Sequence, residues 1–273
     1  MYNSLKISIF VLVLSGFAGL SLSSCDNNKD TKPVITDTTG NDVITGAKGS
    51  LMLHIHNNIG INEVEDYDSV YLDSAGRKIS MSMGQFYLSG VQLVRLDGTV
   101  FKLRKSLVLK VQDAETFLVG DVPAGNYKGL RFYIGLDSSR NKLSAFSGAD
   151  SLLNTSSMWF GAAAQPTGFV YLNFAGRIDT TTGANGTREG MQPFAYKLGT
   201  PMAYKFVQMP EKNFTVSPNQ TAYAHLTADY SRLFTGIQLN NAANLQVKSP
   251  IDNAGASASK VSDNIPAMFS YEE

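Results

Sequence analysis

The chain has 273 residues, of which 23 are acidic and 23 basic, so its formal net charge is zero. A balanced charge without long runs of either sign excludes the broad basic surface that nucleic-acid binding requires, and we expect no nucleic acid as a partner. Apolar residues make up 43% of the chain, as in ordinary globular proteins. The single cysteine excludes a disulfide framework.

The N-terminal segment has the organisation of a secretion signal. Lys6 precedes an apolar stretch over residues 7–22, and small residues follow before Cys25. This order is typical of a secretory signal peptide. A cysteine directly after such a segment is similar to a bacterial lipobox. We therefore predict a signal peptide over residues 1–24 and lipid attachment at Cys25. The alternative is an uncleaved membrane anchor, although the apolar stretch is shorter than the roughly 20 residues that span a bilayer.

Residues 25–48 are polar and turn-forming, and we predict that they form the lipid anchor and a flexible tether. The folded domain would then occupy residues 49–273. A lipid anchor implies an outer-membrane lipoprotein of the cell envelope, facing the periplasm or the surface, with the outer membrane as its partner.

From Ser50 onward, short runs rich in Val, Ile, Tyr, Phe and Leu alternate with Gly, Asn, Asp and Pro, which is the pattern of an all-β protein. Asp97-Gly98 is a two-residue hairpin signal. We predict strands near residues 51–56, 67–72, 86–96, 107–111, 125–136, 168–178, 194–198, 204–206, 213–216 and 222–230. Residues 138–165 and 179–192 are predicted to be irregular.

One helix is predicted near the C-terminus. Ala258, Val261, Ile265 and Phe269 recur at helical spacing, and Pro266 limits the length of the helix. The last residues, SYEE, would form a final strand. The predicted fold is therefore an all-β, antiparallel β-sandwich with a short C-terminal helix.

The stretch SLMLHIH at residues 50–56 predicts a metal site on a strand. Side chains alternate between the two faces of a strand, so the apolar residues at 51, 53 and 55 share one face. The other face carries Met52, His54 and His56. Two imidazoles at this spacing can bind one ion. Imidazole suits copper and zinc, and a thioether such as that of Met52 favours Cu(I).

A tight site needs a further ligand, and His225 is the only other histidine. The alternative is that His54 and His56 are ordinary surface residues, because the HxH motif has low specificity. A third nitrogen or sulfur ligand converging on both imidazoles would distinguish these readings.

Four blocks in order along the chain carry a family resemblance: GQFYLSGVQLVRLDGT (84–99), VPAGNYKGLRFYIGLDSSRN (122–141), SMWFGAAAQPTGFVYLNFAGR (157–177) and PFAYKLGT (193–200). With them, the sequence resembles the MbnP-like family, and specifically its lipoprotein members in the Bacteroidota. The resemblance covers nearly all of residues 50–272.

The resemblance implies a β-sandwich that holds copper in the periplasm or at the cell surface. It implies histidine ligands, one of them on the first strand, where His54 and His56 lie. It also implies a tryptophan oxidised to kynurenine near that histidine, and a di-haem cytochrome peroxidase-like partner.

Two residues depart from the family pattern. The lone tryptophan, Trp159, lies in a later block and not on the first strand, so a kynurenine ligand is not transferred. Lys197 stands where the family has a histidine, and a protonated lysine is a poor ligand.

The sequence thus predicts a copper-binding or copper-handling lipoprotein, with His54 and His56 as ligands and Met52 or His225 as supplements. No GxSxG, HExxH or P-loop motif occurs, so we do not expect an enzyme. The alternative function is a surface lipoprotein without metal, acting in adhesion, scaffolding or glycan binding. Its irregular loops, with Trp159 nearby, would then carry recognition.

Overall fold

A computed structural model describes residues 41–143, 150–164 and 168–272. All of them belong to the second of two units of the chain, Val34–Glu273. Cys25, the predicted signal peptide and most of the predicted tether lie outside these residues. Within the described part, no helix has the length and apolar character needed to cross a bilayer.

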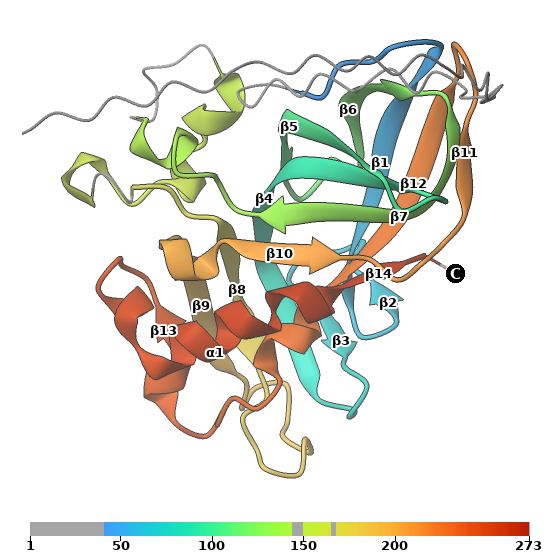
Figure 1. Ribbon diagram of the computed structural model, residues 1–273. Helices are drawn as coiled ribbons and strands as arrows, with labels where there is room; N and C mark the ends of the chain where they lie inside the picture. The colour runs from blue at the N-terminus through green and yellow to red at the C-terminus, as the bar shows by residue number, and fades with distance from the viewer. Residues whose placement is uncertain (1–40, 144–149, 165–167, 273) are drawn as a thin grey trace, which may run out of the picture. The chain divides into compact units, whose positions relative to one another are not determined.

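The smaller of two sheets has five strands: β1 (Lys48–Ile59), β2 (Asn62–Glu63), β6 (Thr116–Pro123), β12 (Thr221–Asp229) and β14 (Phe269–Tyr271). Its strand β1 pairs on one edge with β12, which in turn pairs with β14. The other edge of β1 pairs with β6 and then with β2. The β1–β12 pairing is parallel, and the two strands lie side by side in Figure 1.

The larger sheet has nine strands: β3 (Val70–Leu72), β4 (Lys78–Arg95), β5 (Val100–Lys110), β7 (Gly125–Ile134), β8 (Leu172–Ile178), β9 (Gln192–Leu198), β10 (Lys205–Gln208), β11 (Phe214–Val216) and β13 (Gln246–Val247). Strand β4 pairs with β3, β5, β7 and β8, and its register shifts at three of these pairings. Such shifts mark bulges, which bend a strand.

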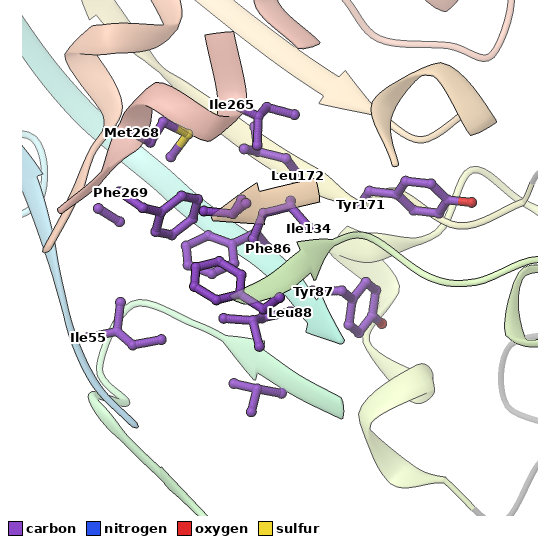
Figure 2. Packing of buried hydrophobic residues seen from close by; sticks show 14 of the residues in the cluster. Ile55, Phe86, Tyr87, Leu88, Ile134, Tyr171, Leu172, Ile265, Met268 and Phe269 are labelled. Carbon is purple, nitrogen blue, oxygen red and sulfur yellow. The ribbon is translucent and has the colours of Figure 1, made fainter. Parts of the chain in front are cut away.

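One hydrophobic core joins the two sheets. Alternation along β1 sends Leu51, Leu53 and Ile55 into this core, where they are fully buried. Figure 2 shows Ile55 at one side of the same core cluster as Phe86 and Leu88 of β4. The Phe269 ring of β14 meets the Phe86 ring edge to face, with their centroids 5.5 Å apart.

The predicted C-terminal helix is present as α1 (Ala256–Asn264), and Ala258 and Val261 are buried within it. Ile265 and Phe269, predicted to continue the helical spacing, are also buried but lie in a 3₁₀ helix and on β14. Short 3₁₀ helices lie in the connections, at Arg140–Lys142, Ser151–Asn154, Ser156–Met158, Ala162–Ala164, Pro201–Ala203, Tyr230–Phe234, Ala242–Leu245, Asp252–Ala254 and Ile265–Met268.

The predicted all-β sandwich is confirmed, and its sheets are mixed rather than wholly antiparallel, because β1–β12 and β9–β13 are parallel. Strand β6 was not predicted. The described end of the predicted tether contacts β5: the Asp42 N–H donates to the Lys102 carbonyl over 2.9 Å, and the Asp42 carboxylate accepts the Lys102 N–H over 3.0 Å.

Candidate metal centre

Strand β1 places two imidazoles on the face that turns away from the core. His54 and His56 alternate with buried aliphatic residues, so both point to the same side. Their ring centroids lie 4.4 Å apart in an edge-to-face arrangement. His56 is the more buried, with 13% of its side chain exposed against 25% for His54.

The third histidine joins them through the parallel pairing of β1 with β12. In this register His225 lies directly opposite His54. The two Nδ1 atoms are 3.0 Å apart, and the ring centroids are 5.0 Å apart. Residues 171 positions apart in the sequence are therefore neighbours on one sheet face.

Three glutamates surround the histidines. The Ile55 N–H of β1 donates to the Glu115 carbonyl over 2.8 Å, and the Glu115 carboxylate lies 3.4 Å from His54 Nε2. Glu63 of β2 contacts His56 Nδ1. Glu272 follows β14 and donates its N–H to the His225 carbonyl over 3.2 Å. Its carboxylate lies 3.4 Å from His225 Nδ1 and 3.8 Å from His56 Nε2.

These side chains form two overlapping sets of metal-binding atoms. One set consists of His54, His56 and Glu115, and the other consists of His54, His225 and Glu272. Within each set, one ligand atom from each residue lies within 4.8 Å of the others. Imidazole nitrogen and carboxylate oxygen are ligands of copper and zinc, so the donors fit a transition metal ion.

The charge around the cluster favours a cation. Three carboxylates lie against the imidazoles, and Lys110 is the basic residue whose charge interacts with Glu63 and Glu115. Lys110 is fully buried and donates from Nζ to the Ala114 carbonyl over 2.7 Å. Burial lowers the pKa of Lys110 to about 8, against the pull of the nearby acidic groups.

A cleft of about 560 Å³ opens beside the cluster, and His56, Glu63 and Glu272 contribute to its wall. Arg232 and Asp229 lie on the same wall. The cluster is therefore reached from solvent on this side.

The structure places His54, His56 and His225 on one sheet face, with His54 beside each of the other two rings. The predicted third ligand, His225, therefore reaches His54, and the sets of close ligand atoms do not join it to His56. Met52 lies on the same face of β1, with Tyr223 and Leu118 opposite it in the neighbouring strands. In the described part of the chain, no hydrogen bond or ring contact joins Met52 to an imidazole.

The other two residues from the family pattern lie elsewhere. Lys197 belongs to β9 of the nine-stranded sheet, where it pairs with Asn173. The Trp159 ring packs edge to face on Phe169, with a centroid separation of 4.7 Å. Neither residue belongs to the histidine cluster.

The three glutamates were not predicted. Glu63 lies in an acidic segment that reads as a solvated loop, and Glu115 precedes the strand that the sequence did not reveal. Glu272 lies within the predicted final strand, SYEE, so of the three glutamates it alone was placed on a predicted strand. No spacing in the sequence links any of the three to a histidine.

Comparison with known proteins gives one family and one solved structure. The family model MbnP matches residues 48–249, which run from the start of β1 to just past β13. The structure of MbnP from Methylosinus trichosporium is similar at 13% sequence identity, over 83% of this chain and 99% of that chain, with a TM-score of 0.46. Among curated proteins, none matches the chain.

Proposed function

Because the chain belongs to the MbnP family, we propose that it is a copper-binding protein whose copper is held by the histidine cluster of the five-stranded sheet. The observation that carries the proposal is that His54, His56 and His225, from two strands, lie in contact in series on one sheet face with acidic side chains around them. In a family member that kept the fold but did not bind metal, nothing would require all three histidines of the chain to lie together.

The donors favour Cu(II) over Cu(I). Nitrogen and oxygen ligands suit Cu(II), whereas thiolate and thioether ligands select Cu(I). The carboxylates of Glu115 and Glu272 lie within reach of the imidazoles, whereas among the described residues no hydrogen bond joins the Met52 thioether to an imidazole. The role we propose is binding or delivery of copper rather than catalysis.

The proposed location is the cell envelope, with Cys25 carrying the lipid that anchors the protein to the outer membrane. This part of the proposal rests on the N-terminal sequence alone. A di-haem cytochrome peroxidase-like partner stays a prediction from the family resemblance. Metabolic labelling with a lipid precursor, compared between the natural chain and a Cys25→Ala variant, tests the anchor. An unlabelled natural chain would contradict it.

The test of copper binding is a titration of residues 34–273, which contain both sheets, under oxidising and reducing conditions. We expect tight Cu(II) binding that weakens by at least about 100-fold in a His54→Ala/His56→Ala double variant, since even loss of an outer-shell partner costs about 10–100-fold. A Met52→Leu variant is the matched control and should bind Cu(II) like the natural protein. Weak binding, equal in all three proteins, would refute the proposal.

A second candidate function, binding of an acidic glycan, is favoured by a cleft of about 660 Å³ on the nine-stranded sheet. Tyr133 and Tyr204 stack there with ring centroids 4.8 Å apart. Four basic residues line the cleft, against the single carboxylate of Asp137: Lys102, Arg104, Lys105 and Arg140. Hydroxyl groups and cations together suit a sugar that carries an acid group.

Titration with a uronic-acid oligosaccharide and with a neutral one of equal length tests this candidate. We expect binding of the acidic sugar alone, reduced in a Lys102→Ala/Lys105→Ala variant. Equal binding of both sugars, or of neither, would reject it without bearing on copper.

A further inference from the structure

The cluster offers more ligands than one ion uses. A transition metal ion in a protein site takes about four ligands. Here three imidazoles and three carboxylates form one continuous series of contacts, in the order Glu63, His56, Glu272, His225, His54 and Glu115. The number of donors is therefore large enough for a second ion to bind in the same cluster.

The histidines do not form one compact site around a single point. The sets of mutually close ligand atoms separate His56 from His225 and share only His54. His56 and Glu115 complete the first set, and His225 and Glu272 complete the second. Each set has two imidazoles and one carboxylate, leaving room for solvent or a further ligand in a four-coordinate site.

The ring of His54 faces the two sets with different atoms. Its Nδ1 lies 3.0 Å from the Nδ1 of His225, and its Nε2 lies 3.4 Å from the Glu115 carboxylate. The two ring nitrogens of an imidazole point in different directions, so one ring can serve two ions. When both nitrogens bind metal, the ring gives up its N–H proton to solvent.

We propose that the cluster binds two metal ions, one in each set, with His54 shared between them. This inference rests on the proposed function, because it assigns a second ion to the same cluster. Glu63 is then a positioning residue: its contact with His56 Nδ1 leaves Nε2 as the ligand atom of that ring. The carboxylates supply most of the negative charge that two divalent ions need.

Matched variants separate the two positions. Glu115→Gln removes the carboxylate of the first set, and Glu272→Gln removes that of the second, with little change in shape in either case. Glu211→Gln is the control, because Glu211 pairs with Lys128 and belongs to neither set. Circular dichroism verifies that each variant is folded.

The experiment is Cu(II) titration with metal analysis, followed by electron paramagnetic resonance at one and at two equivalents. We expect two bound ions in the natural protein and in the Glu211→Gln control, and one in each of the other two variants. The sample with two equivalents should show a half-field line, the mark of two coupled Cu(II) ions, and the single-ion variants should not.

If the natural protein binds one Cu(II) and its electron paramagnetic resonance spectrum has no half-field line, the second metal position is refuted. The proposed copper function would still stand. A natural protein that binds no copper would overturn both. If a variant fails to fold, the stoichiometry and the half-field line of the natural protein still decide the matter.

Discussion

Lys110 places an amine inside the protein with no exposed surface. Burial lowers its pKa from the ordinary value of 10.5 to about 8. Between these pH values the unfolded chain holds a proton on this amine that the folded chain has released. The free energy of unfolding therefore gains a contribution that rises with pH over this window, because the unfolded state binds more protons.

We expect this contribution to disappear in a Lys110→Met variant. Urea unfolding of both proteins between pH 7.5 and pH 9.5 measures it. The free energy of unfolding of the natural protein should increase relative to that of the variant as the pH rises. The upper limit is about 1.4 kcal/mol for each unit by which the pKa is lowered. A difference that does not change with pH would show that the amine is not perturbed.

Gly176 of β8 lies where backbone approaches backbone. A Cβ atom at this position would meet the Ser80 carbonyl oxygen at 1.9 Å, beside the bulge of β4. We expect Gly176→Ala to lower the free energy of unfolding by about 1–3 kcal/mol or more, as overpacking does. Gly183→Ala is the control, since its Cβ would meet only ordinary contacts at 3.5 Å. Equal denaturation midpoints for the two variants would contradict the expectation.

At the residue scale, the sequence predicted the orientation of the β1 side chains and missed the acidic ligands. Strict alternation is a local property, and it correctly sent Leu53 inward and His54 outward. Glu115 reaches His54 only because the Ile55 N–H of β1 holds its carbonyl. Such a contact between distant segments leaves no periodic pattern in the sequence.

At the scale of elements, Asn41 and Asp42, which lie in the predicted tether, contact β5. The Asp42 side chain is almost fully buried and lies 3.8 Å from the Arg104 guanidinium, in addition to its two backbone hydrogen bonds. Asn41 accepts the Lys105 N–H over 2.9 Å. We infer from these contacts that residues 41 and 42 contribute to the stability of the domain that is predicted to begin at residue 49.

Truncation tests this boundary. We expect a chain that starts at residue 48 to be less stable than one that starts at residue 41 by about 1.5–3 kcal/mol, the range for hydrogen bonds to a charged group. An Asp42→Ala change in the longer chain should reproduce most of the loss. Equal melting temperatures for the two truncated chains would show that residues 41–47 do not stabilise the domain and belong to the tether.

The predicted strands matched the structure best where β-branched and aromatic residues alternate with polar ones, as in β1 and β12. Strand β6 was missed because three of its eight residues are exposed, three are only partly buried and Gly120 interrupts it, so its apolar pattern is weak. The parallel pairing of β1 with β12 was also not predicted, because the register between strands this far apart in the sequence is decided by packing and not by turn chemistry.

For the whole molecule, the cluster links metal binding to the stability of the complete fold. Its ligands come from β1, β12 and the segments next to β6 and β14, so an unfolded chain has no such site. A ligand that binds only the folded state stabilises it, by about 2.7 kcal/mol at a concentration 100 times its Kd.

Calorimetry with and without Cu(II) measures this linkage. We expect the melting temperature of the natural protein to rise by several degrees, since about 1 kcal/mol shifts a domain of this size by about 2–4 °C. The His54→Ala/His56→Ala variant should show no rise, and a chelator should reverse the effect in the natural protein. An equal rise in both proteins would place the bound metal elsewhere.

The parallel pairing of β1 with β12 also sets an order of events in synthesis. The first strand of the fold carries two of the imidazoles, but the third comes from residue 225 and the last carboxylate from residue 272. A ribosome must therefore translate the chain as far as residue 272 before all of these groups can meet. A growing polypeptide that has not yet reached residue 225 holds only a pair of histidines, and the full ligand set forms once residue 272 has been added.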